Sequence, residues 1–98
     1  MTNTIPVTKE ILRVHKKVMA RMTVFANAIR EIDNRISVDV EWSTRPGAIH
    51  VRLFQWDDED TISYSDYYDW YYGHPDDKQT KKELFAKIAE WEVKYGLE

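Results

Sequence analysis

The sequence predicts an α+β fold: a long N-terminal helix, a two- to three-stranded antiparallel sheet and a C-terminal helix, with both helices packed on one face of the sheet. Three observations predict it. Apolar residues first recur at spacings of three and four, then alternate with polar residues, and return to spacings of three and four after the break at Gly73-His74-Pro75. A chain of 98 residues is long enough for one modest core, so we expect a single domain over residues 1–98.

The first element is expected to be an amphipathic helix that begins after Thr8 and ends at Asp33-Asn34. Thr8 is a good N-cap residue because its hydroxyl can accept a hydrogen bond from an N–H group of the first turn. The expected buried stripe consists of Ile11, Val14, Val18, Met22, Phe25, Ile29 and Ile32, widened by Leu12, Met19 and Ala26. The opposite side of this helix carries Lys9, Arg13, Lys16, Lys17 and Arg21.

Two strands are expected next, over residues 36–42 and 48–56, joined by a turn at Pro46-Gly47. In the second strand Ile49, Val51 and Leu53 are expected to face the core. The alternating residues His50, Arg52, Phe54 and Trp56 would then face outward, and His50 and Arg52 would lie on the same side as Asp39 and Glu41, so that charges can pair across the strands. A shorter third strand is expected around residues 61–68, with Ile62 and Tyr64 facing inward.

The last element is expected to be a helix that begins after Asp76 and Asp77, which suit the first turn of a helix. Its buried stripe would be Leu84, Ile88, Trp91 and Tyr95, with Phe85 beside it, and Gly96 suits a left-handed residue after the helix. The residues expected to form the core are Ile11, Val18, Met22, Phe25, Ile29, Val38, Val40, Val51, Leu53, Leu84, Ile88 and Trp91.

The net charge of −3 conceals an uneven distribution along the chain. Residues 1–35 contain seven Lys or Arg and three Asp or Glu, whereas residues 36–77 contain two and ten; residues 78–98 contain five and four. The chain is therefore a basic block, an acidic block and a nearly neutral block. Such an uneven charge distribution is a first indication of the kind of partner that the protein binds.

The acidic block contains a segment, residues 56–77, in which acids and aromatic residues occur together without any Lys or Arg. Tyr and Trp at a surface dominate interface hot spots, and carboxylates around them attract a positively charged partner. The predicted partner-binding residues are Trp56, Asp57, Asp58, Asp66, Tyr67, Tyr68, Asp69 and Tyr71. Two alternatives stay open: some of these aromatic residues are core and the acids a solvated loop, or the acidic block lies against the protein's own basic helix.

The sequence contains few of the residues and motifs on which known catalytic mechanisms depend. The chain has no cysteine, only three glycines, and neither a nucleophile elbow nor a phosphate-binding loop. None of the three histidines has a second histidine at metal-ligand spacing. We therefore expect no catalytic residue, metal or cofactor. The lack of cysteine, of a signal peptide and of a membrane-spanning segment favours a cytoplasmic protein without membrane association.

The layout of helix, short antiparallel sheet and helix, with its acidic and aromatic residues, is similar in kind to small phage-encoded inhibitors such as anti-CRISPR and anti-restriction proteins. This is a similarity of layout without a shared motif. It implies a non-enzymatic inhibitor whose acidic surface occupies the basic groove of a nucleic-acid-handling protein. The alternatives are a nucleic-acid-binding accessory protein that uses the basic face of the first helix, and a self-associating protein, for instance a homodimer.

Overall fold

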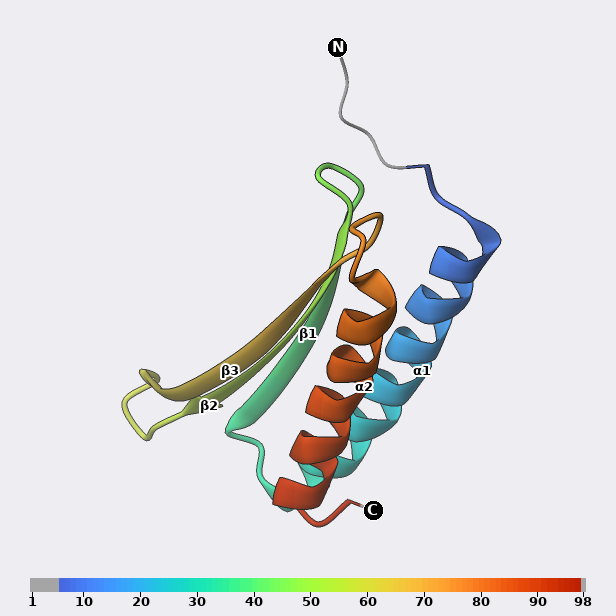
Figure 1. The fold of residues 1–98 in the computed structure, drawn as a ribbon. Helices are drawn as coiled ribbons and strands as arrows, with labels where there is room; N and C mark the ends of the chain where they lie inside the picture. The colour runs from blue at the N-terminus through green and yellow to red at the C-terminus, as the bar shows by residue number, and fades with distance from the viewer. Residues whose placement is uncertain (1–5, 98) are drawn as a thin grey trace.

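The computed structural model describes residues 6–97 and confirms the α+β arrangement. The elements follow in the order α1 (Lys9–Ile32), β1 (Ile36–Ser43), β2 (Ala48–Trp56), β3 (Ile62–Tyr71) and α2 (Asp77–Lys94). The strands form one antiparallel sheet in the order β1-β2-β3. Both helices lie on the same side of this sheet, α1 over β1 and α2 over β3, and the β2–β3 hairpin projects away from them (Figure 1).

Helix α1 begins as predicted, because the Thr8 hydroxyl accepts a hydrogen bond from the Ile11 N–H at 3.3 Å. Its buried residues are Ile11, Val14, Val18, Met22, Phe25 and Ile29. The prediction was wrong for Ile32, Leu12 and Met19, whose exposed fractions are 61%, 43% and 40%. Ile32 is the last residue of the helix. Leu12 and Met19 lie at the edges of the apolar stripe, and only the centre of this stripe packs against the sheet.

Strand β2 is the centre of the sheet, and its inward residues Ile49, Val51 and Leu53 are fully buried, as predicted. The predicted core is otherwise confirmed except at Val38 and Val40, which are only half-buried. Both belong to β1, which in the described part of the chain has a neighbouring strand on one side only. Helix α1 packs over β1 but leaves part of each valine uncovered on the free side.

Strand β3 is longer than predicted and has an irregularity near its start. Gln55 pairs with Tyr64 but Trp56 pairs with Ile62, so that the register skips Ser63. This bulge puts Ile62 opposite the outward-facing Trp56, and Ile62 is 45% exposed, so the predicted inward position was wrong. Tyr64 keeps the helix-facing side but is 39% exposed, and its ring lies under the ammonium group of Lys94, 3.7 Å away.

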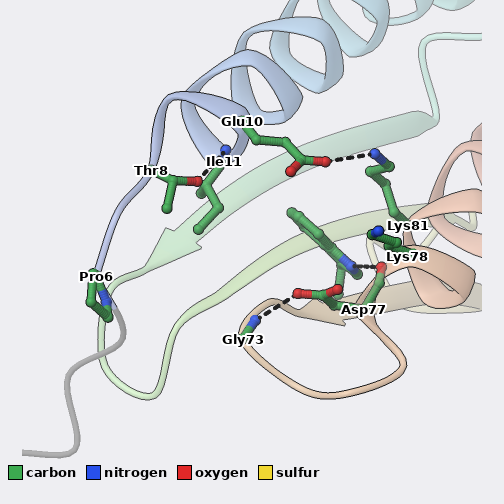
Figure 2. A pocket seen from close by; sticks show the side chains of 9 residues that line it. Pro6, Thr8, Glu10, Ile11, Gly73, Asp77, Lys78 and Lys81 are labelled. Carbon is green, nitrogen blue, oxygen red and sulfur yellow. Dashed lines mark hydrogen bonds and ion pairs between the residues drawn. The ribbon is translucent and has the colours of Figure 1, made fainter.

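Helix α2 closes the core with Leu84, Ile88 and Trp91, all at most 1% exposed. Two contacts of Asp77 join the start of this helix to β3 and to the turn after it. The Asp77 carbonyl accepts a hydrogen bond from Trp70 Nε1 at 2.9 Å, and its carboxylate accepts the Gly73 N–H at 3.0 Å, the contact drawn in Figure 2. The helix ends before Gly96, whose φ of 71° confirms the predicted left-handed residue. Within residues 6–97, neither helix is apolar enough over a sufficient length to cross a membrane.

Candidate functional site

Within residues 6–97, no helix or strand covers the face of the sheet opposite the two helices (Figure 1). Successive residues of a strand point to opposite faces, so the register identifies the side chains on this uncovered side. We call it the open face; its side chains include Ser37, Asp39 and Glu41 from β1, His50, Arg52, Phe54 and Trp56 from β2, and Ile62, Ser65, Tyr67, Asp69 and Tyr71 from β3. The predicted outward position of the four β2 residues is therefore confirmed.

Aromatic side chains are distributed over the whole open face. At the hairpin end, the rings of Phe54 and Trp56 lie 6.4 Å apart between centroids. At the other end, Tyr71 lies edge-on to His50 at 6.2 Å. Tyr67 lies between these pairs and is 63% exposed. Except for Phe54, these rings combine apolar area with a polar group, and such side chains are enriched where proteins bind one another.

The charged groups of the open face neutralise one another only in part. Arg52 Nη1 lies 3.4 Å from a Glu41 oxygen and 3.9 Å from an Asp39 oxygen, so the expected cross-strand charge pairing is present for Arg52. His50 does not pair with β1; its Nδ1 lies 2.8 Å from Asp69 Oδ1 on β3. One guanidinium is thus shared between two carboxylates, which leaves negative charge in excess on this face.

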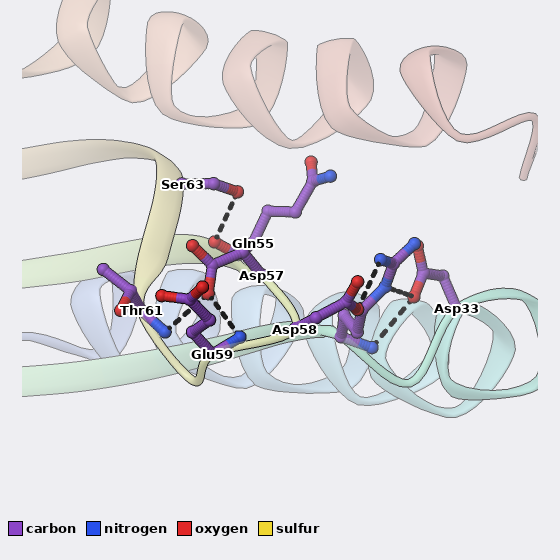
Figure 3. Close-up of polar contacts among 8 residues, drawn as sticks. Asp33, Gln55, Asp57, Asp58, Glu59, Thr61 and Ser63 are labelled. Atoms are coloured by element: carbon purple, nitrogen blue, oxygen red, sulfur yellow. Dashed lines mark hydrogen bonds and ion pairs between the residues drawn. The ribbon is translucent and has the colours of Figure 1, made fainter.

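The loop between β2 and β3 extends this negative charge beyond the sheet, as Figure 3 shows. Asp57 organises the loop, because its Oδ1 accepts the N–H groups of Glu59 and Thr61, both at 2.9 Å. The Asp58 side chain is 91% exposed and reaches Arg35 Nη1 at 3.4 Å. Asp57 therefore shapes the loop, while Asp58 presents its charge to solvent.

Asp66 lies on the helix-facing side and is bonded within the fold. Its Oδ2 accepts hydrogen bonds from Trp91 Nε1 at 2.9 Å and from Lys87 Nζ at 3.0 Å, and its Oδ1 accepts the Tyr67 N–H at 2.9 Å. Burial favours a higher pKa for Asp66, but these three hydrogen bonds together lower the pKa below its ordinary value. The carboxylate is thus a fixed, charged link between β3 and α2.

Tyr68 is the second of the predicted residues that face the helices. It is half-buried, and its hydroxyl donates a hydrogen bond to Glu83 of α2 at 3.0 Å. Burial, followed by the hydrogen bond and the negative charge of Glu83, raises the pKa of Tyr68 to about 12. Its hydroxyl therefore stays protonated and is engaged with the protein's own helix.

The eight predicted residues consequently fall into three places. Trp56, Tyr67, Asp69 and Tyr71 come together on the open face, Asp57 and Asp58 lie in the adjoining loop, and Asp66 and Tyr68 contact α2. Sequence reasoning did not include His50, Arg52 and Phe54 in the site, although the alternation along β2 already indicated that they face outward. Binding of a partner by any of these residues stays a prediction.

Two hollows lie in the helix layer. A cleft of about 290 Å³ separates the starts of the two helices and is bridged by the Glu10–Lys81 ion pair at 3.0 Å (Figure 2). A groove of about 590 Å³ lined by Val24 and Phe85 runs between the helices, beside the Arg21–Glu92 ion pair. Over residues 6–97 the structure contains no cluster of three residues suited to hold a metal ion.

The acidic block does not lie against the basic side of α1 within the described part of the chain, where its ion pairs are made with His50, Arg35, Arg52 and Lys87 instead. Comparison with protein-family models, with curated proteins and with solved structures found no match. Function is therefore inferred from the shape, chemistry and charge of the molecule itself.

Proposed function

We propose that this chain is a non-enzymatic protein-binding module whose open face and β2–β3 loop engage a basic surface on a partner protein. The observation that carries the proposal is the open face itself, on which Trp56, Tyr67 and Tyr71 accompany an excess of carboxylates. An arginine of the partner suits both features, since a guanidinium pairs with carboxylates and stacks on aromatic rings.

A nucleic-acid-handling protein is the partner class that this chemistry favours. Its groove for phosphates is basic, and a rigid acidic surface can occupy such a groove without imitating any base. Inhibition by occupancy needs no catalytic residue, which agrees with a small chain that has one core. This is the manner of action of the small phage inhibitors whose layout the sequence resembles.

Replacing Tyr67 or Tyr71 by alanine is expected to weaken partner binding by about 1–4 kcal/mol at whichever of them is the hot spot. The same changes should alter the free energy of unfolding by no more than about 1 kcal/mol, because Tyr67 is 63% and Tyr71 40% exposed. Val24→Ala is the control, since Val24 is 68% exposed but lies on α1.

The measurement has two steps. Proteins retained by the immobilised wild type but not by the bare support are identified first, and their affinities for all variants are then measured by calorimetry. Unchanged affinity of both tyrosine variants, or an equal loss for Val24→Ala, would exclude the open face as the interface. Thermal melts show whether a loss of binding comes from unfolding.

Partner association is expected to slow steeply as salt concentration rises. Carboxylates such as Asp58, whose side chain is 91% exposed, attract a basic partner before contact. Salt weakens this attraction, because at physiological ionic strength the interaction between exposed charges more than about 8 Å apart is largely screened. Stopped-flow rates from low to high salt measure this effect, with an Asp58→Asn/Glu59→Gln variant as the comparison. A rate independent of salt would rule out steering by the acidic loop.

Heparin chromatography distinguishes this function from nucleic-acid binding by α1, whose Lys16 and Lys17 are exposed. The proposal expects no retention at physiological salt. Retention that is lost in a Lys16→Glu/Lys17→Glu variant would favour the nucleic-acid-binding alternative instead. Light scattering over a range of concentrations tests the third alternative, self-association.

A further inference from the structure

The two edges of the sheet are protected to different degrees. At the β3 edge a charged residue, Asp66, faces the helix side and is bonded to Lys87, Tyr68 is bonded to Glu83, and the pairing skips Ser63. Inward charges and bulges are devices that prevent another strand from adding to a sheet. The β1 edge has neither device: its pairing with β2 is regular, and its helix-facing residues are Ile36, Val38, Val40 and Trp42.

The alternation of hydrogen-bonded and non-hydrogen-bonded pairs between β1 and β2 shows which backbone groups of β1 face its free edge. The Trp56 N–H donates to the Arg35 carbonyl at 2.8 Å, so this pair is a hydrogen-bonded one in the β1–β2 ladder. Hydrogen-bonded and non-hydrogen-bonded pairs alternate along an antiparallel ladder. Val38 and Val40 therefore direct their N–H and C=O groups away from β2, toward the edge where the described residues place no further strand.

A groove runs along this edge between β1 and α1. It has a volume of about 200 Å³ and is lined chiefly by apolar side chains: Met19, Met22 and Ala26 of α1 and Val38 and Val40 of β1. Met19 is 40% exposed and both valines are half-buried. Residues directly opposite one another in paired strands point to the same face. Apolar side chains of an added strand, placed opposite the two valines, would therefore enter this groove.

The side chains of β1 that point to the open face determine what kind of strand can be added at this edge. Asp39 and Glu41 alternate with the valines and lie on the open face, with side chains 54% and 58% exposed. In a symmetric pairing of β1 with a second copy, these carboxylates would come close to their own equivalents, and like charges placed opposite one another destabilise a sheet. Lysine or arginine at those positions of an incoming strand would instead be attracted.

We propose that the free edge of β1 is a docking site for an extended segment of a partner protein in which apolar residues alternate with Lys or Arg. The segment adds antiparallel to β1 as a fourth strand, with its backbone bonded to Val38 and Val40, its apolar side chains in the groove and its basic side chains beside Asp39 and Glu41. This inference rests on the proposed function in one respect, the basic character of the partner.

The test uses a capped eight-residue peptide of alternating Arg and Val as the probe, with the full chain in solution. Calorimetry gives its affinity, and amide hydrogen exchange followed by NMR gives the site. The amides of Val38 and Val40 should exchange quickly in the free protein and become protected when the peptide is bound. N-methylation of the peptide's valines should abolish binding, whereas N-methylation of its arginines should not, because only the valine amides would face β1.

Two variants of the chain make the test specific. Val40→Pro removes an N–H that faces the free edge and leaves the β1–β2 ladder intact, and it should lower peptide affinity about tenfold or more. Asp39→Asn/Glu41→Gln changes only exposed groups and should lower the affinity about threefold, even if the proline variant does not fold. Glu90→Gln, at a carboxylate of α2 whose side chain is 62% exposed, should leave it unchanged.

Equal binding of both N-methylated peptides, or unchanged exchange at Val38 and Val40, would overturn the inference. Protection of these amides that rises with protein concentration in the absence of peptide would assign the edge to a second copy and also overturn it. Tyr67→Ala should not affect the peptide. A partner that loses affinity for Tyr67→Ala but binds Val40→Pro and Asp39→Asn/Glu41→Gln normally would leave the proposed function standing and refute the edge site.

Discussion

Truncating Ile29 to alanine is expected to lower the free energy of unfolding by about 2–5 kcal/mol. Ile29 is 1% exposed and belongs to the core that α1 shares with the sheet and α2. Removal of most of its side chain leaves a cavity that the surrounding side chains can fill only in part. Ile88→Ala, at a fully buried position of α2, should cost a similar amount.

Ile32→Ala is the matched control, since it removes the same atoms from the same helix at a residue that is 61% exposed. We expect it to change the free energy of unfolding by no more than about 0.5 kcal/mol. Urea unfolding followed by circular dichroism measures all three variants. Equal midpoints for Ile29→Ala, Ile88→Ala and the control would contradict the packing of the two helices on the sheet.

Ile29 and Ile32 show how far periodicity predicts a fold. Spacings of three and four predicted α1 and its buried stripe, because they report which side of a helix is apolar. They do not report where the neighbouring sheet ends, and so Ile32 was wrongly included. For a similar reason, alternation predicted which side of β1 faces the helix but not that β1 is an edge strand, which leaves Val38 and Val40 half-buried.

The candidate site was predicted less completely than the fold. Residues 56–77 were treated as one cluster along the chain, whereas a strand sends neighbouring residues to opposite faces. Tyr67, Asp69 and Tyr71 therefore lie on the open face, and Asp66 and Tyr68 face α2. Applying the two-residue period to this segment would have separated the two sets, because the buried Trp70 marks the inner one.

The open face and the free edge of β1 form one continuous surface, since Asp39 and Glu41 belong to both. A partner could therefore add a strand at the edge and extend an arginine-rich surface over the rings of β2 and β3. Backbone pairing would supply affinity that depends little on sequence, and the carboxylates and rings would supply the preference for basic residues. The two sets of variants described above separate these contributions.

Replacing Asp66 by alanine is expected to lower the free energy of unfolding by about 2–3 kcal/mol, as for a charged hydrogen-bond acceptor lost inside a fold. The change leaves the indole N–H of Trp91, a residue only 1% exposed, without its partner, and it also removes the ion pair with Lys87. Asp58→Ala, at a side chain that is 91% exposed, should have almost no effect on stability.

The contribution of Asp66 should also depend on pH. The fold lowers the pKa of Asp66 below its ordinary value, which the unfolded chain retains. Ionised Asp66 therefore stabilises the folded state fully at pH values above the pKa of the unfolded chain, and this stabilisation is lost as pH falls through the lower pKa of the folded state. Asp66→Asn should therefore be less stable than the wild type at neutral pH, and the difference should shrink as pH falls below about 4. Urea midpoints from pH 7 to pH 2 measure it. A stability equal to that of the wild type at every pH, together with weaker partner binding, would return Asp66 to the interface that the sequence indicated and contradict its role as a link between β3 and α2.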